Sequence, residues 1–171
     1  MLEKRFCPLE YRADAGRVEG TAIRYGSTAN IAGVFKERFT PGAFGNVSGL
    51  DVIVRLQHER SRPIGRTQGG GLELSDSPEE LAAALALPHT RDGEDAAELL
   101  RLRILRGWSV EFRAKRERFE NDVRIVDEAD LSGLGLVDRP AYGDSLAKIA
   151  KRFEQPTATT IQKPSSRFLW L

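Results

Sequence analysis

The chain is poor in the side chains that bind metal ions or form cross-links. Its 171 residues include one cysteine, Cys7, and two histidines, His58 and His89. A single cysteine excludes an internal disulfide and indicates a reducing compartment. Because so few ligands are available, we expect no structural zinc site, and no other cofactor is predicted. An enzyme mechanism that needs an imidazole has only two positions from which to take it.

The chain also lacks an excess of charge and a long apolar run. Lys plus Arg total 26 and Asp plus Glu total 25, which gives a net charge of +1. A dedicated nucleic-acid binder would show a basic surplus, so no nucleic acid is predicted as a partner. No stretch reaches the ~18 apolar residues of a membrane span, so no membrane is predicted either. The N-terminus, Met1–Phe6, is charged where a secretion signal needs an apolar run, so we expect no signal peptide.

The remaining composition is that of one folded domain with a polar tail. Hydrophobic residues make up 40% of the chain and charged residues 30%, a balance typical of globular domains. From residue 153 onward the sequence is polar, rich in Pro, Ser and Thr, and without periodicity. We therefore expect one domain over residues 1–152 and a flexible tail over residues 153–171.

Short alternating segments dominate the domain and predict strands. These segments are 17–25, 51–56, 72–75, 81–87, 108–114, 123–126 and 131–137. Residues 92–105 are the best helix, because acids crowd the first turn, arginines the last, and Asp92 can cap the start. Asn121-Asp122 predicts a tight turn between two strands. The pattern predicts an α+β, strand-rich fold built on a small antiparallel β-barrel with a few helices around it.

One serine and one histidine stand where chemistry is plausible. Ser109 lies early in a predicted strand that begins after Gly107, although a hydroxyl that is bonded within a sheet is the alternative interpretation. His58 follows the buried strand 51–56, where a loop opens. A serine becomes an effective nucleophile only when a nearby base removes its proton. His89 lies in a proline-containing turn, which favours a structural or solvent-exposed role.

Four sequence blocks occur in a recognisable order and spacing. They are Phe39–Phe44; Leu56–Glu59 followed by Pro63–Thr67; Leu87–Leu100; and Gly107–Phe112 followed by Ala129–Tyr142. Each block alone is weak, whereas their shared order over residues 15–147 is specific. In these blocks the chain resembles the caudovirus prohead protease family, the head-maturation serine peptidases of tailed phages.

The resemblance implies both a fold and an activity. The family is distantly similar to the herpesvirus assembly proteases, in which an antiparallel β-barrel ringed by helices carries the site on adjacent strands. The implied activity is that of a serine endopeptidase that cuts scaffold, the scaffold-like arm of the major capsid protein, and itself. It would act in the host cytoplasm, inside the assembling prohead. The alternative is a non-catalytic scaffold or capsid-assembly module on the same fold. An α/β-hydrolase is excluded, because Ser109 lacks the Gly-x-Ser-x-Gly elbow.

The resemblance also implies functional residues. Ser109 matches the family's nucleophile and His58 its general base. Many phage relatives carry a glutamate where this chain has Gly133, and a glycine where this chain has Glu111. Alternate side chains of a strand share a face, so Glu111 lies on the face of Ser109. If the two strands are neighbours, Glu111 is the predicted orienter of His58; a solvent-facing strand glutamate is the alternative.

One further assignment, Arg139, completes the predicted site. By resemblance, Arg139 lies in a turn that supplies an oxyanion donor, through its N–H or through a held water. An arginine that pairs with Asp138 or Asp144 at the surface is the alternative. If Glu111 is not the third member, the site is a Ser109–His58 dyad or uses another group, such as Asp130 or a water.

Overall fold

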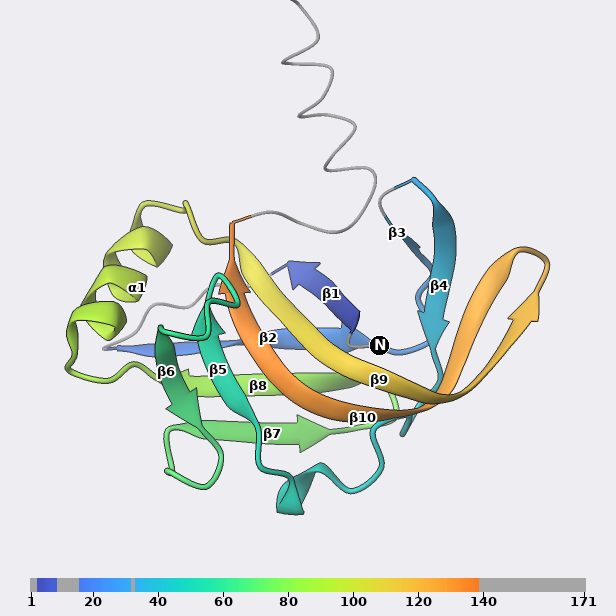
Figure 1. The fold of residues 1–171 in the computed structure, drawn as a ribbon, viewed down its shortest axis with the longest axis horizontal. Coiled ribbons are helices and arrows are strands. Elements are labelled where there is room, and N and C mark those ends of the chain that lie inside the picture. Colours follow the sequence, from blue (N-terminus) through green and yellow to red (C-terminus); the bar gives the residue numbers. More distant parts are fainter. Residues whose placement is uncertain (1–2, 9–15, 32, 139–171) are drawn as a thin grey trace, which may run out of the picture.

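The computed structural model of the protein describes residues 3–8, 16–31 and 33–138. Within these residues the chain forms two β-sheets, one α-helix and one short 3-10 helix (Figure 1). The larger sheet has seven strands: β1 (Glu3–Pro8), β3 (Ala29–Ile31), β4 (Phe35–Phe39), β5 (Ile53–Leu56), β6 (Pro63–Arg66), β9 (Gly107–Glu120) and β10 (Val123–Val137). The smaller sheet contains β2 (Arg17–Arg24), β8 (Glu80–Ala86) and β7 (Leu72–Asp76), in that order. The helices are α1 (Arg91–Arg101) and the 3-10 helix η1 (Val47–Gly49).

A long hairpin of β9 and β10 forms the centre of the larger sheet. Asn121 and Asp122 join the two strands, and both have positive φ angles, 47° and 64°. Such angles match the right-handed twist of a two-residue hairpin turn, so the predicted tight turn is confirmed. The segments 123–126 and 131–137, predicted as two strands, are one strand that is interrupted by bulges. Figure 1 shows the hairpin, in yellow and orange, curving across the molecule.

The hydrophobic core lies between the two sheets. In the smaller sheet, Leu81, Ala83 and Leu85 of β8 face inward and are buried. In the larger sheet, the inward residues alternate along each strand: Val54 and Leu56 of β5, Trp108, Val110 and Phe112 of β9, and Leu134 and Leu136 of β10. The residues between them therefore face the opposite side of the larger sheet. This opposite side is called the outer face below.

The helix was predicted too long and with the wrong cap. It begins after Thr90, whose side chain accepts the backbone N–H of Gly93, so Thr90 rather than Asp92 is the N-cap. It ends in a Schellman motif, because the N–H of Ile104 donates to the carbonyl of Leu99 while Arg103 has a φ of 57°. An arginine occupies the left-handed position that glycine usually fills, so the sequence carries no stop signal there.

The prediction of an antiparallel barrel is only partly right. The strand-rich α+β class is confirmed, and the hairpin of β7 and β8 has the predicted antiparallel pairing. However, β10 pairs in parallel with β4 near its start and with β5 near its end. A fifteen-residue strand is long enough to take two short partners in succession along one edge. Among the described residues the sheets form no closed barrel, and α1 is the single α-helix.

Candidate functional site

His58 lies in a tight turn that directly follows β5. Gln57 and His58 both have positive φ angles, 53° and 59°, and the N–H of Glu59 donates to the carbonyl of Leu56 at 3.0 Å. The N–H of Gln57 donates to the carbonyl of Leu136 at 2.9 Å, which ties the turn to β10. Left-handed backbone costs a non-glycine residue about 1–2 kcal/mol, so the surrounding contacts hold this turn. Strain of this kind often marks a functional site.

The carboxylate of Glu111 contacts the imidazole of His58. The distance between Nδ1 of His58 and Oε1 of Glu111 is 2.7 Å. Both side chains are largely buried, with exposed fractions of 10% and 8%. The alternative of a solvent-facing glutamate is therefore wrong. An ionised carboxylate can only accept a hydrogen bond, so a neutral imidazole that donates to Glu111 carries its proton on Nδ1. Its Nε2 is then the atom that can accept another proton.

Glycines on β10 make room for this contact. Gly133 is the backbone partner of Glu111, and Gly135 is the partner of Ser109. The condition that the two strands are neighbours is therefore met. A Cβ atom built on Gly135 would lie 2.7–2.9 Å from three atoms of the His58 ring, closer than real Cβ contacts. The ring therefore occupies the space above Gly135, beside the strand position of Ser109.

The nucleophile candidate belongs to the same surface. Ser109 is buried on β9 and alternates with the core residues Trp108 and Val110, so it shares the outer face with Glu111. The strands β9, β10 and β5 lie side by side in this order (Figure 1). The hairpin thus contributes the hydroxyl and the carboxylate, and the segment after β5 contributes the imidazole. Gly135, the backbone partner of Ser109, is the residue that the His58 ring covers.

Arg55 of β5 is a fourth charged group at this position, and the sequence analysis missed it. Its Nη1 lies 3.7 Å from Oε2 of Glu111, a charge contact rather than a hydrogen bond. Arg55 alternates with the buried Val54 and Leu56, so it faces the outer side. That alternation was visible in the sequence, as was the Gly133-x-Gly135 spacing. Their significance depends on the order of the strands in the sheet, which was not visible.

The other predicted positions fall outside the site or outside the described residues. His89 is exposed in the loop before α1, as the proline-containing turn predicted. Asp130 is exposed on β10, and its carboxylate contacts Nζ of Lys115 at 2.6 Å. Arg139, Asp144 and the predicted tail over residues 153–171 lie outside the described residues, so the structure does not test them.

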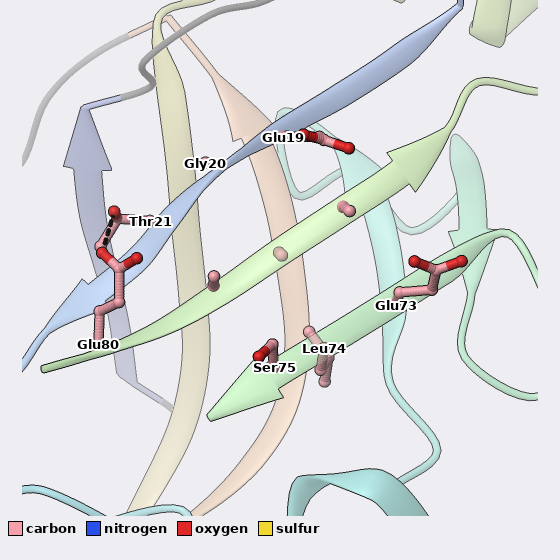
Figure 2. Close-up of a pocket in the computed structure, with 10 residues that line it drawn as sticks. Glu19, Gly20, Thr21, Glu73, Leu74, Ser75 and Glu80 are labelled. Atoms are coloured by element: carbon pink, nitrogen blue, oxygen red, sulfur yellow. Dashed lines mark hydrogen bonds between the residues drawn. The ribbon is translucent and has the colours of Figure 1, made fainter. Parts of the chain in front are cut away.

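A hollow of about 700 Å³ lies on the smaller sheet, on the side away from the core (Figure 2). It forms because the small residues Ala82 and Ala84 face outward from the central strand β8. Larger side chains of β2 and β7 flank them on either side (Figure 2). In Figure 2 the hydroxyl of Thr21 donates to Glu80 at one end. No histidine lines this hollow, and none of the predicted site residues is in it. The chemistry-bearing residues therefore gather on the other sheet.

A serine, an imidazole and a carboxylate on one surface are the side chains that serine hydrolases use. The comparison with family models agrees with this class. Residues 8–159 match the model described as caudovirus prohead serine protease, so the chain belongs to that family. Membership implies a serine protease with a role in phage head maturation and capsid-related protein substrates. No curated protein and no solved structure gave a match. Over the described part of the chain, no helix is long and apolar enough to cross a membrane.

Proposed function

We propose that the protein is an active serine endopeptidase in which Ser109 is the nucleophile, His58 the general base and Glu111 the group that orients His58. The observation that carries the proposal is the 2.7 Å contact between His58 and Glu111 over the glycines that pair with the nucleophile strand. In the proposed site the imidazole proton is on Nδ1, which faces the carboxylate, and Nε2 is left to act as a base. Family membership supports the reaction class.

The reaction then follows the general scheme of serine proteases. Oγ of Ser109 attacks the scissile carbonyl carbon while Nε2 of His58 takes the hydroxyl proton. Glu111 stabilises the imidazolium that forms. When the C–N bond breaks, the imidazolium gives its proton to the leaving amine, and an acyl-enzyme remains. Water, deprotonated by His58, hydrolyses this ester and returns Ser109 to its starting state. We assign the oxyanion contact to Arg139, through its N–H or a held water.

The substrates we propose are proteins of the assembling phage head. They are the scaffold, the scaffold-like arm of the major capsid protein, and the protease itself, cut inside the prohead in the host cytoplasm. We also propose a distant relation in fold to the herpesvirus assembly proteases, in which the two sheets correspond to an opened barrel. Family membership supports the setting of head maturation.

The test is co-expression with the major capsid protein of the same phage, followed by mass spectrometry of both chains. The wild type is expected to release defined fragments, and Ser109→Ala to release none, a loss of at least ~10³-fold. Ser75→Ala is the matched control, because Ser75 is an exposed serine on the other sheet and its loss should change nothing. Wild-type processing by Ser109→Ala would refute the nucleophile. Absence of cleavage with all three proteins would favour the non-catalytic assembly module.

A further inference from the structure

We propose that Arg55 is a positioning residue of this site, acting on His58 through Glu111. The inference rests on the proposed function and adds a group that neither the sequence blocks nor the family comparison assigns. Arg55 contacts the carboxylate of Glu111, and that carboxylate contacts the imidazole of His58. Arg55 therefore acts through Glu111 and not directly on the reacting atoms. Its role is to hold the Glu111 carboxylate turned towards His58.

The two oxygens of Glu111 have different partners. Oε1 lies 2.7 Å from Nδ1 of His58, and Oε2 lies 3.7 Å from Nη1 of Arg55. The carboxylate therefore bridges an imidazole and a guanidinium that both come from the β5 segment. A carboxylate that is held at both oxygens cannot rotate about its last bond without losing one partner. This fixes which carboxylate oxygen faces Nδ1 of His58.

The bridge depends on an empty position on the middle strand. Gly133 lies between Glu111 of β9 and Ile53 of β5 in the sheet register. A Cβ atom at Gly133 would lie 2.9 Å from Oε2 of Glu111 and 3.4 Å from Nη1 of Arg55. Any larger residue would therefore enter the space in which the two charges meet. The glycine allows the side chains of two strands that are not neighbours to form an ion pair across a third.

Burial explains why the carboxylate needs a cation at this place. The Glu111 side chain is 8% exposed and the Arg55 side chain 21%. Removal from water disfavours an ionised carboxylate, and a nearby positive charge offsets that penalty. The catalytic scheme requires Glu111 to be charged, because it stabilises the imidazolium. Arg55 is always protonated, so it provides this compensation at every working pH.

Arg55 should also influence the proton affinity of His58. Within residues 3–8, 16–31 and 33–138, the ion-pair contacts place these charged groups near the imidazole: Glu111 from β9 and, behind it, Arg55 from β5. Glu59 adjoins His58 in the same turn, β10 contributes glycines, and Lys4 of β1 is the backbone partner of Glu111. Removal of a positive charge favours the imidazolium. The pH at which the imidazole becomes a base should therefore rise when Arg55 is neutralised.

The experiment uses the full chain and a fluorophosphonate probe, so no natural substrate is needed. Oγ of Ser109 attacks phosphorus, fluoride leaves, and His58 takes the hydroxyl proton, so the labelling rate reports the activated serine. Labelling is followed from pH 5 to pH 9, and mass spectrometry locates the label. We expect Arg55→Met to label about 10-fold more slowly and to move the acid midpoint upward by roughly half a pH unit. Arg55→Lys should restore the wild-type midpoint, since it keeps the charge.

Arg66→Met is the matched control. Arg66 lies on the neighbouring strand β6 and pairs with Asp51, so its loss removes the same charge from the sheet away from the site. The control should keep both the wild-type rate and midpoint. If Arg55→Met does not fold, as judged by its thermal melt, Arg55→Gln replaces it with the same expectation.

Two results would overturn the role of Arg55 alone. One is a neutral Arg55 variant with the wild-type rate and midpoint. The other is a slower variant whose midpoint does not move, because that is the result of a purely structural role. A wild-type protein that is not labelled at Ser109 would overturn the proposed function, and the role of Arg55 with it.

Discussion

Replacement of Glu111 by glutamine tests the catalytic assignment most directly. The change keeps the size of the side chain and removes its charge. A glutamine amide has one acceptor oxygen, whereas both His58 and Arg55 approach Glu111 with positive or donor groups. If the oxygen turns to His58, the NH₂ group faces Arg55. If the oxygen turns to Arg55, the NH₂ group faces Nδ1 and forces the imidazole proton onto Nε2. A protonated Nε2 cannot accept the proton of Ser109.

The magnitude of the effect follows from the charge that is lost. At an effective dielectric constant of about 20, two unit charges about 4 Å apart attract by about 4 kcal/mol. Loss of most of this stabilisation of the imidazolium corresponds to about 10²- to 10⁴-fold in rate. The loss should be smaller than for Ser109→Ala, because Glu111 takes no proton itself. Thermal stability should change little, since glutamine keeps the size and polarity of the side chain and the Arg55 side chain, 21% exposed, still reaches water.

The assay measures cleavage of the co-expressed capsid protein and labelling by the fluorophosphonate, both against Glu128→Gln. Glu128 is an exposed glutamate on β10 that pairs with Arg116, so its variant should behave as the wild type. Processing by Glu111→Gln at the wild-type rate would refute the assignment and leave a Ser109–His58 dyad.

Transfer of the carboxylate between strands gives a second readout of the same reasoning. Gly133→Glu alone should reduce activity, because its Cβ would lie 2.9 Å from Oε2 of Glu111. Combined with Glu111→Gly, the new glutamate takes the vacated space on the adjacent strand. The double variant should therefore exceed Glu111→Gly alone in labelling rate. Equal rates would show that the carboxylate cannot act from β10.

Further outcomes are expected from single changes. Gly135→Ala should lower activity at least ~10²-fold while the protein stays folded by circular dichroism, because a Cβ there lies 2.7–2.9 Å from the His58 ring; retained activity would contradict the ring position. His58→Ala should be as inactive as Ser109→Ala in the capsid assay, with the double variant no worse, whereas the exposed His89 should be replaceable by alanine without loss. Wild-type labelling should rise with pH over about pH 6 to 8, where an imidazole loses its proton, and a flat profile would argue against His58 as base. Thr90→Ala should lower the free energy of unfolding by about 1 kcal/mol in urea titrations, as loss of an N-cap does, with activity unchanged below the melting temperature.

Local patterns predicted the local parts of the fold. The hairpin of β9 and β10 followed from alternation and turn residues, because its two strands are neighbours in sequence. The parallel pairs of β10 with β4 and β5 could not be predicted. The sequence of a strand carries no signal for a partner strand that lies many residues away. The end of α1 was missed for a different reason: Arg103 takes a conformation that the sequence signals only when glycine is present.

The sequence blocks supplied the candidate residues Ser109 and His58, and strand alternation supplied Glu111. The contact between His58 and Glu111 depended on β9 and β10 being neighbours, which the sequence could state only as a condition. Arg55 and Gly135 were missed, because an arginine in an apolar strand and a glycine in a strand are individually unremarkable features. Their place in the site follows only from the order of the strands β5, β10 and β9 in the sheet.

The division of the site between a hairpin and a distant segment also sets the order in which it can form. Ser109, Glu111 and both site glycines belong to one hairpin that is closed by a two-residue turn. His58 joins them only when β5 docks in parallel, and there Val54 pairs with Leu134, 80 residues further along the chain. Contacts of such long sequence separation form late, because the loop entropy must be overcome first. If Ser109 and His58 act as proposed, the serine should therefore stay without its base until this late step, and a newly made chain should not cleave its neighbours early.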